Sequence, residues 1–304
     1  MTLKLIDLGH SHRKLLEIRK DKNNQLEIIC SDYLPSSRPE NYWESLESDL
    51  PYLKKKWKLG SGPLECLLPA RFFNYALRLE NEGVAPSKNL ETTMEPAIGQ
   101  RFNQMLERHG LEASFLGSSL TSTIEVLRRY SRANPQKPLL LIALTFSSTS
   151  AILISQGQIK KLESSSTLSS RMLDHLVRSK WPDSELDLIG LKQNELILLP
   201  IYRKEQELVE GFQKLRPYFE DVLDFIRIAS VTQNSWEQNQ PLEILLSDGG
   251  ALLRNLNCYI QGTLDIPCRT IESDFFRLVV ENLRGLADLS SIFNPLIAHL
   301  SLRD

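Results

Sequence analysis

Apolar and polar positions alternate along this chain in a pattern of short buried strands and longer amphipathic helices. Near the start, residues 3–8 and 15–18 are rich in Leu and Ile, and a polar turn containing Gly9 separates them. Apolar runs of this length, bounded by turn residues, are typical of buried strands. A third run around residues 26–29 follows another polar turn. The first thirty residues therefore predict three strands joined by tight turns.

Helical spacing begins in the segment 40–58, where large apolar residues recur three or four positions apart. Pro51 is expected to divide this segment into two helices, because proline disfavours the helical conformation of the residue before it. The spacing of apolar residues further along the chain predicts strands at 64–68, 72–79 and 111–116 and helices at 97–109 and 122–132. The segment 82–96 is predicted to be rich in loops.

The opening pattern returns after the polar linker 134–138. Residues 139–144 form an apolar run, a small polar turn follows, and a second apolar run covers 151–155. A turn at 156–158, a strand at 159–163 and a helix at 169–181 complete the pattern. The two copies share no recognisable sequence, so the chain repeats an arrangement of elements rather than a motif.

The last third of the chain predicts a long helix, a strand ending in two glycines, and terminal helices. The helix covers 204–233, and Pro217 is expected to kink it. The strand 242–246 runs into Gly249 and Gly250, which suit a turn that needs a positive φ or has no room for a Cβ. The remaining predictions are a short strand within 263–271 and helices at 275–286 and 292–302.

Length and composition limit the function classes. A chain of 304 residues suggests two domains, and a formal net charge of −2 gives no global basic field for nucleic acid. No apolar run reaches the roughly 18 residues of a membrane span, so any membrane role would need another protein. The four cysteines lack CxxC spacing and no secretory signal is visible, which predicts reduced thiols in the cytoplasm.

The first turn carries candidate chemistry. Asp7 ends an apolar strand and is followed by Gly9 and Ser11. A carboxylate in this position can hold hydrated Mg²⁺, and the N–H groups of the turn can face phosphate oxygens. An ordinary hairpin with an Asp-X-Gly turn explains the same residues. The turn alone leaves both interpretations open.

Three glycine- or serine-rich turns, each after an apolar strand, stand in order along the chain: residues 7–11, 144–149 and 247–251. This order resembles the actin-like ATPase superfamily, in which the first two turns hold phosphates and magnesium and the third lies against adenosine. The resemblance implies an α/β, ribonuclease H-like fold of two domains around a central cleft. The nucleotide-binding residues that it implies are Asp7 (also the magnesium ligand), Gly9, His10, Ser11, Lys14, Ser147, Ser148, Thr149, Gly249 and Gly250.

Within the superfamily, the chain looks most like the PilM family of type IV pilus assembly. The opening Ile6-Asp7-Leu8-Gly9 with Lys14 and Glu17, the pair Leu68-Pro69, the stretch 247–267 and the end at 293–303 carry this likeness. It implies domain I at 1–137 with an inserted subdomain at about 70–120, and domain II at 138–277. Terminal helices at 278–304 would return to domain I. The cytoplasmic domain of the type II secretion protein GspL shares the fold and is the nearest alternative.

The second turn departs from the family pattern D-I-G-A-x-x-T. Ala143 stands in place of the acid and Thr145 in place of the glycine. The alanine at position 143 removes a carboxylate that would hold magnesium or position the attacking water. The Cβ of Thr145 crowds a turn that must approach phosphate closely. His10 and His12 also stand where small hydroxyl residues are usual in the family. A zinc site would need more ligands at fitting spacing, so we expect both histidines to face solvent or to be hydrogen-bonded. The resemblance thus implies a degenerate member that does not turn over ATP, with ATP and Mg²⁺ or no cofactor equally open.

The expected function is that of a cytoplasmic scaffold in a pilus or type II secretion assembly at the inner membrane. The family implies one partner, the cytoplasmic N-terminal peptide of a PilN-like membrane protein, together with other pilus assembly proteins. The ribbon with Arg71, Phe72, Phe73 and Tyr75 would bind it, as extended peptides bind exposed strand edges. The membrane is reached only through partners, and self-association stays open. The alternative is an active ATPase or small-molecule kinase that uses Asp248 or Glu243, and a filament-forming actin homologue is a third class.

Overall fold

The computed structural model of the chain describes ten stretches: residues 2–21, 25–38, 40–60, 62–80, 87–180, 188–193, 209–230, 242–271, 283–284 and 293–302. The chain divides into two compact units. Unit 1 comprises residues 1–76, 90–126 and 272–304, and unit 2 comprises residues 77–89 and 127–271. Each unit is built around its own sheet.

The sheet of unit 1 begins with the three predicted strands. β1 (Thr2–Leu8), β2 (His12–Lys20) and β3 (Leu26–Pro35) form an antiparallel meander. β4 (Leu64–Leu68) adds parallel to β1, and β7 (Phe115–Ser118) adds parallel to β4. β13 (Leu283–Arg284) pairs with the far edge, so the order is β13-β3-β2-β1-β4-β7.

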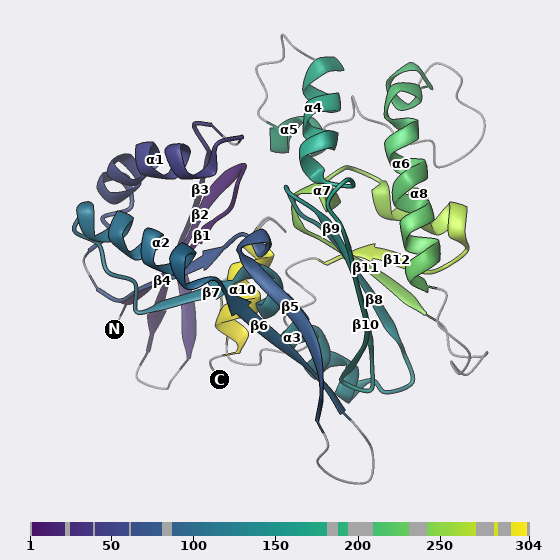
Figure 1. Cartoon of the computed structure of the whole chain (residues 1–304), viewed down its shortest axis with the longest axis horizontal. Helices are drawn as coiled ribbons and strands as arrows, with labels where there is room; N and C mark the ends of the chain where they lie inside the picture. The colour runs from purple at the N-terminus through teal and green to yellow at the C-terminus, as the bar shows by residue number, and fades with distance from the viewer. Residues whose placement is uncertain are drawn as a thin grey trace. The chain divides into compact units, whose positions relative to one another are not determined.

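Helices α1 (Tyr42–Lys56) and α2 (Pro96–Arg108) pack on one side of this sheet (Figure 1). Leu46, Leu50 and Leu53 from α1 and Phe102 and Met105 from α2 are buried in one core cluster with side chains of β1 and β4. The helix α10 (Asn294–Ser301) is buried along its whole length and contacts β1. The burial of one face of α1 and of α2 explains the helical spacing of apolar residues in these two segments.

Unit 2 repeats the same sheet arrangement. β8 (Leu139–Leu144), β9 (Thr149–Ser155) and β10 (Gln158–Ser165) form an antiparallel meander. β11 (Glu243–Ser247) pairs parallel to β8, and β12 (Cys268–Thr270) pairs parallel to β11. The order β10-β9-β8-β11-β12 therefore matches β3-β2-β1-β4-β7 strand for strand, which confirms the repeat predicted from the sequence.

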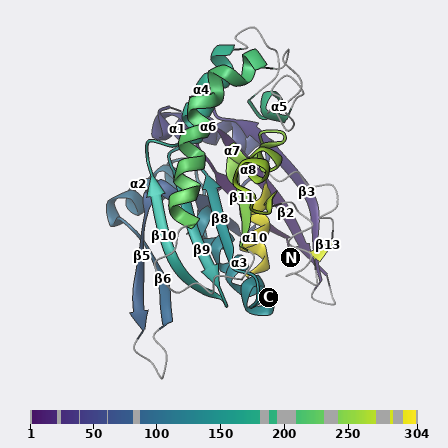
Figure 2. The ribbon, with the colours of Figure 1, turned by 90° about the vertical axis from the view of Figure 1, so that its right-hand side faces the viewer.

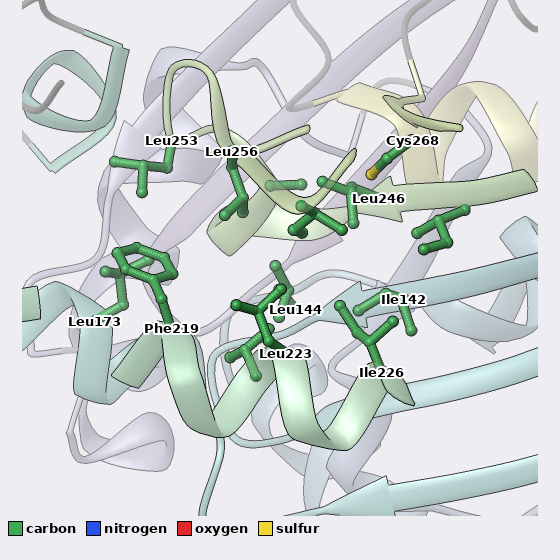
Figure 3. Close-up of a cluster of buried hydrophobic side chains, with 14 of the residues drawn as sticks. Ile142, Leu144, Leu173, Phe219, Leu223, Ile226, Leu246, Leu253, Leu256 and Cys268 are labelled. Carbon is green, nitrogen blue, oxygen red and sulfur yellow. The ribbon is translucent and has the colours of Figure 1, made fainter. Parts of the chain in front are cut away.

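The long helix α6 (Val209–Ser230) covers one face of the second sheet, with α8 (Leu256–Leu264) beside it (Figure 2). In Figure 3, Leu223 and Ile226 of α6 point toward Leu144 and Ile142 of β8, and Phe219 lies nearer Leu173. These side chains are almost completely buried. The helix α4 (Ser170–Lys180) contributes Leu173 and Val177 to the same cluster.

The remaining described helices are α3 (Ser119–Ala133), α5 (Leu188–Gln193) and the single turn α7 (Asp248–Ala251). β5 (Phe73–Glu80) and β6 (Ser87–Met94) form a separate two-stranded sheet, preceded by the 3₁₀ turn η1 (Ala70–Phe72). All four cysteines are free thiols. Among the described residues, no helix is long and apolar enough to cross a membrane.

Several element predictions are wrong. Pro51 does not divide α1, since it lies on the exposed side while Leu50 and Leu53 are buried on the other side of the helix. The segment 82–96 contains β6 rather than only a loop. The predicted strand at 111–116 begins at Phe115, and residues 263–264 belong to α8. Leu283–Arg284 is a strand, so the helix predicted at 275–286 does not include it, and the other residues of that prediction lie outside the described stretches.

The glycines in the three turns do not use positive φ angles. Positive φ occurs instead at Gly60, Gly62, Gly110 and Gly157, and at Asp248, where φ is 70°. Close approach is the constraint at two of the predicted turn glycines. A Cβ on Gly9 would lie 2.9 Å from the His12 carbonyl oxygen, and one on Gly250 would lie 2.6 Å from Leu144 Cβ. Gly249 has room, because its nearest neighbour would be Ser170 Oγ at 3.9 Å.

Candidate functional site

The first candidate site is the turn between β1 and β2 in unit 1. Register places Asp7 opposite Lys14, and Lys14 Nζ lies 2.7 Å from Asp7 Oδ2. The Asp7 side chain is buried, while Lys14 is partly exposed. A lysine that reaches a buried carboxylate compensates its desolvation. The structure therefore brings together two predicted site residues, with the carboxylate already engaged.

Arg13 connects this turn to α1 through side-chain hydrogen bonds. Its guanidinium is fully buried and donates to Asp49 Oδ2 and Ser45 Oγ, both at 3.1 Å. It also donates to the carbonyl oxygens of Leu8 and Gly9. Arg13 was missed among the site residues predicted from sequence. The signal was present, because Arg13 lies two positions before Leu15 and so shares the buried face of the strand.

His10 turns inward rather than toward the open side of the turn. Its ring lies 4.8 Å from Tyr42 and 6.3 Å from Phe72, measured between ring centroids. His10 and His12 are both buried, so of the two expected alternatives the solvent-facing one is wrong. Burial in an aromatic cluster gives His10 a packing role. Ser11 contributes its carbonyl oxygen, which accepts from the N–H of Ser36 at 2.8 Å.

The second candidate site is the turn between β8 and β9 in unit 2, and Thr145 closes it internally. Thr145 Oγ1 donates to the Ser148 carbonyl oxygen at 2.8 Å and accepts from the Ser148 N–H at 3.2 Å. The Thr145 N–H also donates to the same carbonyl oxygen at 3.0 Å. Ser147 is half-buried, whereas Thr149 is fully buried in β9. Thr145, at the position where the resemblance implies a glycine, thus supplies the hydroxyl that holds the turn together.

The first turn of α4 faces the carbonyl groups of this second turn. Ser170 N–H donates to the Thr145 carbonyl oxygen at 2.8 Å, and Arg171 N–H donates to that of Phe146 at 3.1 Å. Free N–H groups at a helix start are a common anion site. In this protein, two of the N–H groups at the start of α4 already donate to backbone carbonyl oxygens.

The third candidate site is the glycine pair in α7, and a buried ion pair holds it. Lys192 from α5 pairs with Asp174 from α4, and both side chains are buried. Lys192 Nζ also donates to the Gly249 carbonyl oxygen at 3.0 Å. The Tyr218 hydroxyl lies in the same neighbourhood, since burial first and then the Asp174 charge raise its pKa. Neither Lys192 nor Asp174 was among the predicted site residues, because only the fold brings 174, 192 and 249 together.

The two acids of the alternative enzyme interpretation lie at opposite ends of the second sheet. Glu243 starts β11 opposite Leu139, and its carboxylate pairs with Arg269 at 2.6 Å. Asp248 follows Ser247, which is opposite Ala143 at the other end, and accepts from Ser247 Oγ at 2.8 Å. Four residues of strand separate the ends by about 13 Å. Only Asp248 lies at the end of the sheet that carries the candidate turns.

The predicted partner-binding residues begin in η1 and continue into β5. Phe72 is buried against Tyr42, with ring centroids 4.9 Å apart, and Arg71 is exposed above both rings. Phe73 and Tyr75 are half-buried, and the Tyr75 hydroxyl lies 2.5 Å from Ser118 Oγ. The structure places these four residues on one short segment of unit 1 with a mixed aromatic and cationic surface.

Several polar groups of each turn, taken unit by unit, are already engaged within the protein. A magnesium nucleotide needs carboxylate or hydroxyl oxygens for the metal and free N–H donors for the phosphates. Asp7 supplies a carboxylate that Lys14 already engages, and position 143 supplies only a methyl group. The Ser148 N–H is used by Thr145. Among the described residues, no group of three or more His, Cys, Asp or Glu side chains could hold a metal ion.

Comparison with known proteins places this geometry in a fold. No protein-family model and no curated protein sequence matches the chain. Solved structures do match. One is a PilM–PilN type IV pilus biogenesis complex, at 14% identity and a TM-score of 0.66, covering 98% of this chain and 97% of that one.

Two other structures match over most of the chain. The ethanolamine utilization protein EutJ from Carboxydothermus hydrogenoformans matches at 11% identity with a TM-score of 0.56, covering 98% of this chain and 88% of that one. MreB5 of Spiroplasma citri bound to ADP matches at 13% identity with a TM-score of 0.54, covering 98% and 94%. The fold expected from the three turns is therefore confirmed: the chain has the actin-like fold, and it resembles the PilM–PilN structure over almost all of its length.

Proposed function

We propose that this protein is an actin-like scaffold that binds the cytoplasmic N-terminal peptide of a PilN-like membrane protein within a type IV pilus or related secretion assembly. The observation that carries the proposal is the likeness to the PilM–PilN structure, which extends over 98% of this chain and 97% of that one. Such a scaffold would work in the cytoplasm and reach the inner membrane through its partner.

Weak or lost nucleotide binding is part of the proposal. Three observations support it: the Asp7 carboxylate is engaged by Lys14, Ala143 offers no oxygen, and Thr145 closes the second turn. A turn that satisfies its own donors has little to gain from phosphate oxygens, because a new hydrogen bond would replace an existing one. The protein then acts by holding a partner rather than by turning over ATP.

The proposed peptide site is the segment Arg71–Tyr75 with its neighbouring rings. Among the described residues, β5 and β6 form a sheet of only two strands, so each strand has an edge that pairs with no other described strand. An extended peptide can pair with such an edge through its backbone, while pockets beside the strand select its side chains. Phe73 lies at the start of β5 and is half-buried, so part of its ring is available to a partner.

A binding experiment tests the proposal. A fluorescent synthetic peptide of the cytoplasmic N-terminal segment of a PilN-like protein from the same organism is titrated with purified protein. We expect saturable binding that weakens by about tenfold in Phe73→Ala, the scale of a central aromatic contact. Tyr52→Ala is the matched control, because Tyr52 is an aromatic residue of unit 1 that is 58% exposed on α1. Absence of binding to wild-type protein would contradict the proposed partner.

A further inference from the structure

The helix α10 covers the face of the unit 1 sheet that lies opposite α1 and α2. Successive side chains of a strand point to opposite faces of a sheet. Leu64 and Cys66 of β4 belong to the core cluster with α1 and α2, so Glu65 between them points to the other face. His299 of α10 contacts Glu65 there. All eight residues of α10 are buried, and Figure 1 draws this helix, in yellow, away from α1.

A buried hydrogen bond joins α10 to the sheet. His299 Nε2 lies 2.9 Å from Glu65 Oε2, and the exposed fractions of the two side chains are 9% and 4%. A carboxylate only accepts hydrogen bonds, so the neutral imidazole donates through its Nε2–H. The Phe115 ring of β7 stacks on the imidazole, with centroids 4.7 Å apart and planes inclined by 25°. Phe115 is itself 40% exposed, so its ring lies between the buried pair and solvent.

The sheet face toward α10 carries two buried carboxylates with different partners. Asp7 of β1 is ion-paired with Lys14 of β2, and a lysine keeps its charge up to about pH 10. Glu65 of β4 contacts His299, and a histidine changes its charge near neutral pH. The contact between α10 and β4 therefore includes a group that can respond to mild acid.

The remaining titratable groups of β1, β4 and β7 do not face His299. Lys4 of β1 points to the opposite face, where it donates to the carbonyl oxygens of Trp57 and Lys58. Cys66 of β4 lies in the core cluster on that same opposite face. β7 has the sequence Phe-Leu-Gly-Ser and contains no titratable side chain. Within α10, His299 is the only titratable residue.

Burial sets the direction of the pH effect. Desolvation lowers the pKa of His299 below the ordinary histidine value of 6.5, so the cost of burying the imidazolium outweighs its attraction to the carboxylate. A released helix, with its imidazole in water, therefore binds a proton more readily than the docked helix does. Docking is complete above about pH 6.5 and weakens as the pH falls below that value.

We propose that α10 is a pH-sensitive latch on the sheet of unit 1, which loosens when His299 takes up a proton. The inference goes beyond the proposed function and does not depend on the partner. Release uncovers apolar side chains of the same sheet face, such as Leu5 and Leu67, which are buried in the folded unit. Each pH unit below about 6.5 should raise the ratio of released to docked helix by up to about tenfold, until the pKa of the docked form is reached.

Native-state hydrogen exchange, read by mass spectrometry on peptides of α10, measures the opening of this helix. Rates are compared at about pH 7.5 and about pH 5.5, after correction for the intrinsic exchange rate at each pH. We expect the opening constant of α10 in wild-type protein to rise by about five- to tenfold at the lower pH. His299→Gln keeps a side-chain N–H for Glu65 but cannot take up the proton, so its opening constant should change by less than about twofold.

The controls separate release of α10 from a general effect of acid. His175→Gln, at an exposed position on α4 of unit 2, should behave as wild type. A rise of less than about twofold in wild-type protein, or an equal rise in His299→Gln, would overturn the proposal. An equal rise in peptides of α1 would also overturn it, because the whole unit would then open rather than α10.

A proton NMR titration of the imidazole signals measures the pKa of His299 in the folded protein directly. The His299 signal is the one absent from His299→Gln. Phe115→Leu, which removes the stacked ring, should shift the same signal and identifies it even if His299→Gln does not fold. We expect a midpoint below 6.5. A midpoint at or above 6.5 would overturn the proposal, because protonation would then strengthen the docking of α10.

Discussion

The turn between β1 and β2 and the turn between β8 and β9 occupy the same position in two sheets that share the order of five strands. The first turn keeps a buried carboxylate, Asp7, with Lys14 opposite it. The second has the methyl group of Ala143 at the matching strand end and a threonine that bonds to its own turn. The two turns also differ in what holds them. Arg13 ties the first to a helix 32 or more residues away, whereas Thr145 ties the second to Ser148 only three residues away.

This difference teaches that topology and chemistry are maintained by separate residues. The apolar strands set the position of each turn, together with one close approach at each. Gly9 makes this approach within the first turn, and Gly250 of α7 makes it against Leu144, just before the second turn. The polar atoms at the turn decide what it can bind, and they can be replaced without disturbing the strands. The comparison predicts that the first turn depends on long-range charge and the second on local hydrogen bonds.

The largest expected effect is at the first turn. Asp49→Asn leaves the fully buried Arg13 guanidinium without its carboxylate, which should lower the free energy of unfolding by about 3 kcal/mol. Urea unfolding followed by circular dichroism measures the change. Glu44→Gln is the control, because the Glu44–Arg38 pair is exposed on both sides and should contribute less than about 0.5 kcal/mol. Equal small losses in both variants would show that Arg13 does not anchor the turn.

The next effect separates the two glycines of the third turn. Gly250→Ala forces a Cβ to within 2.6 Å of Leu144 Cβ, so unfolding should become easier by about 1–3 kcal/mol. Gly249→Ala should stay within about 0.5 kcal/mol of wild type, because the nearest atom would be 3.9 Å away. Thermal melts of both variants provide the test. Gly262→Ala in α8, with no atom within 4 Å, controls for the change in helix propensity. Matching melts for Gly249→Ala and Gly250→Ala would disprove the close packing of α7 on β8.

A smaller effect is expected at the second turn. Thr145→Val keeps the shape of the side chain but removes the hydroxyl that bonds to the Ser148 N–H and carbonyl oxygen, at a cost of about 1–2 kcal/mol. Thr145→Ser retains the hydroxyl and should recover most of this loss. Urea unfolding of the two variants decides between a hydroxyl effect and a packing effect. A Thr145→Ser variant as unstable as Thr145→Val would favour packing and remove the local-bond account of the turn.

The smallest effect concerns nucleotide. We expect MgATP to bind so weakly that the concentration used does not exceed its Kd, which adds at most about 0.4 kcal/mol to stability and raises the melting temperature by less than about 2 °C. Phosphate release should remain at background, because Ala143 supplies no oxygen for a metal or water. A malachite green assay and a thermal shift assay measure both quantities. Magnesium-dependent phosphate release that disappears in Asp7→Ala or Asp248→Ala would establish the alternative, an active ATPase or kinase.

Much of the fold could be predicted from the sequence because its strands are apolar runs and its helices carry buried stripes. Periodicity located β1, β8 and β11 within a residue or two, and the order of the three turns indicated the actin-like arrangement. β6 was missed because its sequence, with Thr92 and Thr93 among polar neighbours, has no apolar alternation. Pro51 misled because local preference argued for a break that the buried face of α1 overrides.

The candidate site was predicted less completely, and the reason is distance along the chain. Asp7 and Lys14 face each other across a hairpin, so register alone brings them together. The partners of Arg13 and Lys192 come from separate helices, and no local pattern links Arg13 to Asp49 or Lys192 to Asp174. His10 was assigned to phosphate by analogy, whereas the aromatic neighbours that bury it come from residues 42 and 72.

The pairing of β13 with β3 has a consequence for how the chain acquires its structure. Leu283 pairs with Leu26, so the edge of the first sheet closes only after nearly the whole chain has left the ribosome. Unit 2 is drawn almost entirely from one continuous stretch, residues 127–271, whereas unit 1 needs residues 272–304 as well as the first seventy-six. Contacts between distant residues form slowly because their loop-closure entropy must be overcome first. The second unit in sequence is therefore expected to fold first during synthesis, and the first unit to be completed last.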